Sequence, residues 1–129
     1  RKCVEIHANL FDVSGNLNNV DFAIPSAKNP RVVVEVMEFE RLSQLLWRRI
    51  KELDHKFQGI KLKYPEVLTG LCLRVRSLER GVYPEIITKI KKMTFNTDKI
   101  FLNEEMKNFP KWVEDVTTLA FPCDRHAAS

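Results

Sequence analysis

Glycine and cysteine are both scarce in this chain of 129 residues, which has four glycines and three cysteines. So few glycines leave no room for a glycine-rich phosphate loop, and neither a P-loop nor a G-x-G-x-x-G run is present. Cys3, Cys72 and Cys123 are widely spaced and odd in number, which argues against a disulfide framework and against a zinc site. This cysteine pattern favours a reducing compartment, the cytosol or the nucleus.

Long apolar runs and grouped catalytic side chains are absent as well. No stretch approaches the roughly 18–20 consecutive apolar residues that span a bilayer, so no membrane partner is expected. The three histidines have no partner at metal-ligand spacing, and the acidic pair Glu104 and Glu105 are adjacent, so they face different directions on a helix. The sequence therefore predicts no enzyme activity, no metal and no cofactor.

The composition is that of one ordinary globular domain covering residues 1–129. Apolar residues make up 44% of the chain and charged residues 29%, which excludes a disordered tail. The chain begins with Arg1 and not Met, which suggests an excised piece of a longer protein or the product of a removed leader.

The first 36 residues have the two-residue period of half-buried strands. Val4, Ile6, Ala8 and Leu10 alternate with polar residues, residues 20–24 repeat the alternation, and residues 31–34 form a β-branched run. We expect a small β hairpin or sheet here.

The period changes to that of helices from Glu35 onward. Apolar residues recur every three or four positions from Val36 to Phe57, again over residues 65–78, and in shorter stretches after Pro84 and Asp98. Pro110 should kink the last helix or begin a separate one. The predicted fold class is α+β, with the small N-terminal β hairpin or sheet packed on a bundle of four to five α-helices over residues 37–120, and with a frayed tail over residues 121–129.

Positive charge is concentrated in the middle of the chain. Lys and Arg exceed Asp and Glu by 21 − 17 = 4 overall, and residues 41–99 hold fourteen basic residues against six acidic ones. A basic surface of this kind permits contact with nucleic acid, because clustered cations release counterions from a polyanion. The residues expected to form this face are Arg74, Arg76, Arg80, Lys89, Lys91 and Lys92.

Two predicted links between helices carry apolar residues that the core does not obviously need. The first link contains Ile60 and Leu62, and the second contains Phe95 followed by Asn96. If antiparallel packing brings both links to one end of the bundle, they form an apolar patch rimmed by Lys61 and Lys63. Such a patch suits a protein or a short acidic peptide with an aromatic or aliphatic anchor.

Residues 41–116 resemble the integrase-binding domain of the lens epithelium-derived growth factor family, a helical fold related to the N-terminal domain of the elongation factor TFIIS. The resemblance rests on a long first helix, on Pro65 opening a second helix, on the run from Ile90 to Phe95, and on a last helix closing at Trp112. It implies docking of short acidic peptides with an aromatic residue at the links near Ile60, Leu62 and Phe95. The family has an acidic residue in the first link, where this chain has Lys61 and Lys63.

These observations favour a non-enzymatic protein-interaction module, a nuclear scaffold or adaptor that docks peptides. Nucleic-acid binding through the basic face is the alternative. A self-assembly domain of a structural or viral protein, with the β portion supplying an edge strand, is the second alternative, so a homo-oligomer is possible.

Overall fold

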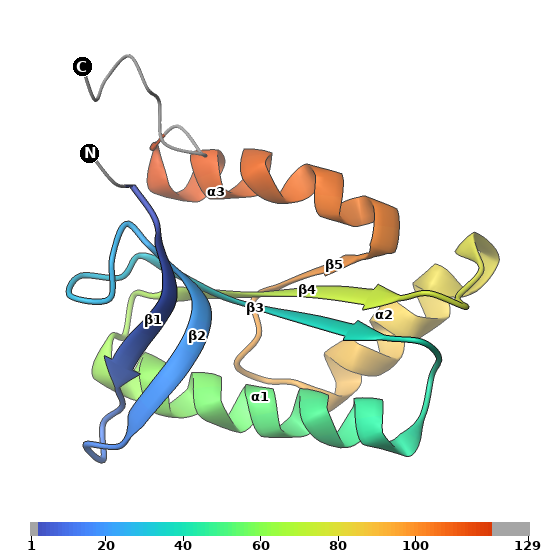
Figure 1. Cartoon of the computed structure of the whole chain (residues 1–129), viewed down its shortest axis with the longest axis horizontal. Helices are drawn as coiled ribbons and strands as arrows, with labels where there is room; N and C mark the ends of the chain where they lie inside the picture. Colours follow the sequence, from blue (N-terminus) through green and yellow to red (C-terminus); the bar gives the residue numbers. More distant parts are fainter. Residues whose placement is uncertain (1–2, 120–129) are drawn as a thin grey trace.

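A five-stranded mixed sheet forms the centre of the computed structural model, which describes residues 3–119 (Figure 1). The spatial order is the chain order, β1-β2-β3-β4-β5. The first three strands pair antiparallel, whereas β3, β4 and β5 pair parallel. The strands span Glu5–Phe11 (β1), Leu17–Ile24 (β2), Val32–Phe39 (β3), Leu68–Val75 (β4) and Lys99–Leu102 (β5).

Helices cover the two faces of the sheet unequally. The two crossover helices, α1 (Gln44–Lys63) and α2 (Tyr83–Met93), lie on one face, and α3 (Phe109–Thr117) lies across the other (Figure 1). Short 3-10 turns at Arg80–Val82 (η1) and Asn103–Asn108 (η2) precede α2 and α3. Parallel strands need such crossovers, because the chain must return from the end of one strand to the beginning of the next.

The long helix α1 begins and packs as its sequence dictates. The Ser43 hydroxyl accepts a hydrogen bond from the Leu46 N–H at 3.3 Å and caps the first turn. Buried apolar side chains then recur every three or four residues and point at the sheet: Leu46, Ile50, Leu53, Phe57 and Ile60. The helix ends at Lys63, directly before Tyr64 and Pro65.

The core has two parts because the sheet is covered on both sides. The larger part lies under α1 and α2, and a smaller aromatic part lies under α3. In the smaller part the Phe101 ring centroid is 5.6 Å from those of Phe109 and Trp112. Strand β4 is buried on both faces, so consecutive side chains, Leu71, Cys72 and Leu73, are all apolar.

The structure corrects the predicted fold class. A bundle of four to five helices is wrong, because the described chain has a five-stranded sheet and three α-helices. Residues 32–39 form strand β3, so Val36 and Phe39 do not belong to the first helix. Residues 68–75 form strand β4, and residues 99–102 form β5.

The predicted resemblance to the integrase-binding domain is also wrong. Of the elements that carried it, the stretch after Pro65 is a strand and not a helix, and the Phe95 link leads into strand β5. A mixed sheet runs through the region that this helical family would occupy. The predicted frayed tail at 121–129 lies outside the described residues.

None of the described helices combines the length and the apolar character needed to cross a membrane.

Candidate functional site

Two carboxylates lie between strands β2 and β3 at the point where their pairing stops. The last ladder pair is Phe22 with Val34, and the same register places Asp21 opposite Glu35. At this point the two carboxylates accept hydrogen bonds from backbone N–H groups, in place of the carbonyl groups of a regular strand pair. The Asp21 N–H donates to Glu35 Oε1 at 3.2 Å, and the Val36 N–H donates to Asp21 Oδ2 at 2.6 Å. Acidic side chains therefore bridge β2 and β3 where the backbone pairing of the two strands ends.

A lysine from the crossover helix joins this pair. Lys56 of α1 places its Nζ 3.9 Å from Glu35 Oε1 and donates a hydrogen bond to the Asn19 carbonyl at 2.9 Å. Both side chains are partly shielded from water, with exposed fractions of 29% for Lys56 and 16% for Glu35. Three consecutive elements, β2, β3 and α1, thus converge at one place.

The electrostatics of the site are unusual for a surface ion pair. Burial raises the pKa of Glu35, the positive charge of Lys56 lowers it, and the negative charge of Asp21 raises it again. Burial, and after it the charge of Asp21, raises the pKa of the Cys72 thiol to about 12. That thiol is therefore a poor nucleophile, whereas a half-buried carboxylate with a raised pKa is typical of functional sites.

The two carboxyl groups lie close together. Asp21 Oδ2 and Glu35 Oε1 each accept one backbone N–H, and the two carboxyl groups also lie within hydrogen-bonding reach of each other, a contact that, after burial, raises the pKa of Glu35. Within that range no three His, Cys, Asp or Glu side chains gather into a group that could hold a metal ion. Two carboxylates nevertheless suit Mg²⁺, which keeps several waters and is commonly bound through one or two carboxylates plus phosphate oxygens.

A row of cations extends along α1 from this site. Arg49, Lys56 and Lys63 recur every seven residues, so they lie on one face of the helix, about 10 Å apart along its axis. Lys63 lies 5.3 Å from the centre of the Phe11 ring, which places this face toward β1 and β2. The row can follow a chain of phosphates that passes the carboxylates.

The predicted docking residues do not form one surface. Ile60 is completely buried in the core, whereas Leu62 is 61% exposed and Phe95 is 88% exposed. Leu62 lines a cavity beside the β1–β2 turn, and Phe95 is not part of that cavity. Lys61 is engaged with Asp98 at 2.6 Å, and Lys63 lies over the Phe11 and Tyr64 rings.

The Phe95 loop is held rigidly by a buried carboxylate on α1. Asp54 is 7% exposed and accepts hydrogen bonds from the Phe95 and Asn96 N–H groups at 3.0 and 2.8 Å. It also accepts bonds from the Asn96 side chain and from the Thr97 hydroxyl. The phenyl ring is therefore presented to solvent on a fixed backbone.

Half of the predicted basic face, its three arginines, is paired with acidic neighbours. Arg74 and Arg76 pair with Glu38, and Arg80 lies 3.9 Å from Glu104. Arg74 lies on strand β4 and not on a helix, and Lys89 lies over the Trp47 ring at 4.0 Å. Lys91 and Lys92 are exposed in the last turn of α2. The three arginines of the predicted face are therefore paired with carboxylates, whereas its three lysines form no such pair within residues 3–119.

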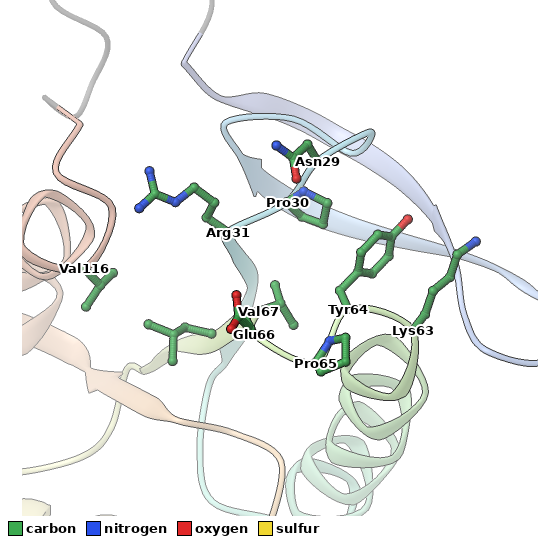
Figure 2. Close-up of a pocket in the computed structure, with 10 residues that line it drawn as sticks. Asn29, Pro30, Arg31, Lys63, Tyr64, Pro65, Glu66, Val67 and Val116 are labelled. Atoms are coloured by element: carbon green, nitrogen blue, oxygen red, sulfur yellow. The ribbon is translucent and has the colours of Figure 1, made fainter.

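A shallow cavity of about 390 Å³ opens between the end of α1 and the start of β3. Figure 2 shows Tyr64 and Lys63 on one side of it and Arg31 on the other, with the Arg31 and Lys63 side chains pointing apart. Arg31, Lys63 and Glu66 are all exposed, so no desolvated charge points into this cavity. It lacks the convergent polar groups that define a binding site.

Neither Asp21 nor Glu35 is among the residues predicted from the sequence. Asp21 and Glu35 are far apart along the chain, and only the register of β2 and β3 brings them together. One signal is visible in retrospect. Each is a charged residue inside an apolar strand, between Val20 and Phe22 or between Val34 and Val36.

Comparison with protein-family models, with curated proteins and with solved structures gives no match.

Proposed function

We propose that this protein hydrolyses phosphodiester bonds in nucleic acid with the help of a divalent cation. The observation that carries the proposal is the group formed by Asp21, Glu35 and Lys56 where β2 and β3 separate. Two carboxylates and a lysine are the side chains that such chemistry uses, since the carboxylates hold the cation and the lysine offsets the charge of the phosphate. This proposal replaces the expectation of a protein without an active site.

Each residue has a distinct part in the proposed reaction. Asp21 and Glu35 would hold the cation, while the Val36 and Asp21 N–H groups fix one oxygen of each carboxylate. A bound divalent cation would supply an activated water and neutralise a phosphate oxygen. Lys56, fixed between Glu35 and the Asn19 carbonyl, orients the phosphate beside the carboxylates.

The reaction itself is a balanced hydrolysis. The oxygen of water bonds to phosphorus while the bond from phosphorus to one sugar oxygen breaks. The water loses one proton to solvent, and the departing sugar oxygen takes one up to become a hydroxyl. Water is the only co-reactant, and no oxidant is needed.

Nucleic acid is the substrate that the charge distribution favours. The chain has a net charge of +4, and the Arg49, Lys56 and Lys63 row leads along α1 to the carboxylates. A polyanion gains affinity from each neutralised phosphate, so this row would hold the strand in register with the site.

Cleavage of labelled single- and double-stranded DNA and RNA in Mg²⁺ or Mn²⁺ tests the proposal. We expect cleavage that EDTA stops, and a loss of about 100-fold or more in Asp21→Asn and Glu35→Gln. Lys56→Met should lose about 10-fold or more, because it removes a charge from the phosphate position.

Matched variants exclude a general effect of charge. Glu38→Gln lies on the same strand as Glu35, and Lys51→Met lies on the same helix as Lys56, yet neither residue is in the site. Both should retain wild-type cleavage. If no substrate is cut with either cation, or if Asp21→Asn cuts as fast as wild type, the proposal is wrong.

Protein docking through Phe95 is a second candidate function. Its support is the 88% exposure of a ring on a backbone that Asp54 fixes. Binding of a fluorescent acidic peptide containing one Trp, measured by anisotropy, tests this function. Phe95→Ala should abolish the binding, whereas Phe11→Ala, which shortens another exposed ring, should not.

A further inference from the structure

The exposed Phe95 ring has a counterpart elsewhere on the surface. A cavity of about 430 Å³ lies between the β1–β2 turn and the outer side of α1. Its apolar lining comes from Val13 and Leu62, which are 56% and 61% exposed. A phenyl ring fits this volume comfortably, since an apolar cavity of roughly 150 Å³ already holds benzene.

The cavity has firm walls. The Val13 N–H donates to the Gly59 carbonyl of α1 at 3.3 Å, which ties the turn to the helix. Within the turn, Asp12 accepts hydrogen bonds from the Ser14 and Asn16 N–H groups and from the Asn18 side chain. The cavity is therefore largely formed before anything enters it, which reduces the entropy lost on binding.

Charge complementarity links the ring to this cavity. Phe95 is flanked along the chain by Lys91, Lys92 and Lys99, all of them exposed and outside the ion pairs formed among residues 3–119. The cavity wall carries the acidic side chains of Asp12 and Glu52 together with His55 and Lys56, so carboxylates outnumber lysines there. Opposite charges around an apolar contact favour encounter and fix its orientation.

The ring cannot fill the cavity of its own molecule. Asp54 holds the Phe95 and Asn96 N–H groups on the side of α1 that carries Asp54 itself, and the ring remains 88% exposed there. A second molecule is free of this restraint. It offers a preformed cavity with an apolar lining from Val13 and Leu62 and with Asp12 and Glu52 on its wall beside Lys56, which suits an aromatic ring flanked by lysines.

We propose that Phe95 of one molecule inserts into the cavity between the β1–β2 turn and α1 of a second copy. This proposal rests on Phe95 docking, the second candidate function, and it names the occupant. It also gives new roles to two residues predicted as one docking patch: Phe95 is the anchor and Leu62 lines the acceptor.

Molar mass measured by light scattering across a range of concentrations tests the contact. Wild type should increase in mass with concentration, whereas Phe95→Ala and Leu62→Asp should each stay monomeric. The matched controls are Phe11→Ala and Leu45→Asp, which alter exposed residues outside the cavity and should associate as wild type does. All four positions are exposed, so thermal unfolding should confirm that the variants fold.

A mixing experiment separates a specific contact from general stickiness. Phe95→Ala keeps an intact cavity and Leu62→Asp keeps an intact ring, so an equimolar mixture should form a one-to-one complex that neither variant forms alone. Failure of the mixture to associate, or a wild type that is monomeric throughout, would overturn the second copy as occupant. If the acidic peptide nevertheless binds to monomeric wild type and not to Phe95→Ala, Phe95 docking stands with a different partner.

Discussion

At the scale of single residues, Glu35 occupies a position that lowers the stability of the fold and favours a chemical role. Its carboxylate is 16% exposed, and burial is the largest influence on its pKa, which is raised. Lys56 at 3.9 Å offsets only part of the cost of keeping a negative charge there. A group selected for stability alone would be apolar or better paired, so this placement favours a function.

Glu35→Gln should make the protein more stable at neutral pH. Because the folded state holds the pKa of Glu35 above its unfolded value of 4.5, the protonated form is favoured in the fold. That stabilisation is complete below about pH 4.5 and is lost as pH rises through the raised pKa. The variant mimics the protonated form, so its gain should be on the order of 0.5–2 kcal/mol at pH 7 and should vanish below about pH 4.5.

Urea denaturation at several pH values measures this difference. A glutamine variant that is less stable than wild type at pH 7 would show that the Lys56 pair outweighs burial, and the argument from Glu35 would fail.

Asp54→Ala should release the Phe95 loop. The substitution leaves the Phe95 and Asn96 N–H groups, the Asn96 amide and the Thr97 hydroxyl without their buried acceptor. We expect a loss of about 2–4 kcal/mol in unfolding free energy and faster hydrogen exchange at the Phe95 and Asn96 amides. Unchanged protection of those two amides would contradict the rigid presentation of the ring.

At the scale of elements, predictions from the sequence succeed where an element has one buried face. Strands β1 and β2 alternate apolar and polar residues and were predicted, and helix α2 begins beside Pro84 as expected. Pro110 lies in the first turn of α3, which confirms that it begins a separate final helix. When one face is buried, apolar residues repeat every two positions in a strand and every three or four positions in a helix, so the two can be told apart.

Strand β4 shows why the parallel part of the sheet could not be predicted. Its residues from Leu71 to Leu73 are buried on both faces, so the period of two disappears, and the remaining apolar spacing imitates a helix. Strand β3 was missed beyond Val34 for a related reason, because Val36 and Phe39 continue the spacing of α1. Only the parallel pairing of β3 with β4 distinguishes the two possibilities.

Gly70→Ala should disturb the contact between the sheet and α3. A Cβ added at Gly70 would lie 3.2 Å from Trp112 Cζ3, tighter than most Cβ contacts in proteins, so the indole ring would have to shift. We expect a loss of about 1–3 kcal/mol and a changed Trp fluorescence spectrum. Gly81→Ala is the control, since nothing lies within 4 Å of its added Cβ. Equal stability of the two variants would mean that α3 shifts to accommodate the added Cβ with no loss of unfolding free energy.

At the scale of the whole molecule, the distribution of charge could be predicted only in part. The excess of basic residues is visible in the sequence, but the ion pairs of Arg74, Arg76 and Arg80 with Glu38, Glu40 and Glu104 require the parallel sheet. The Asp21 and Glu35 pair likewise exists only once β2 and β3 are in register. Long-range pairing, and not residue type, decides which charges face an open surface.

Nucleic-acid binding should therefore depend on α1 and not on the arginines of β4. Without a cation Lys56 stays paired with Glu35, so two phosphate contacts by Arg49 and Lys63 predict a slope of about −1.8 in log K against log salt for duplex DNA. Anisotropy of a labelled duplex in EDTA measures it. Arg49→Ala should reduce the slope by about 0.9, whereas Arg76→Ala should leave it unchanged, because Arg76 already pairs with Glu38. If Arg76→Ala reduced the slope and Arg49→Ala did not, the interface would lie on the basic face predicted from the sequence.

Titration of the protein with Mn²⁺, followed by electron paramagnetic resonance, tests the central claim most directly because it needs no substrate. We expect one ion bound per chain at neutral pH, lost in Asp21→Asn and in Glu35→Gln and retained in Glu38→Gln. Absence of binding to wild type, or equal binding by the Asp21→Asn variant, would contradict the assignment of these two carboxylates as a cation site.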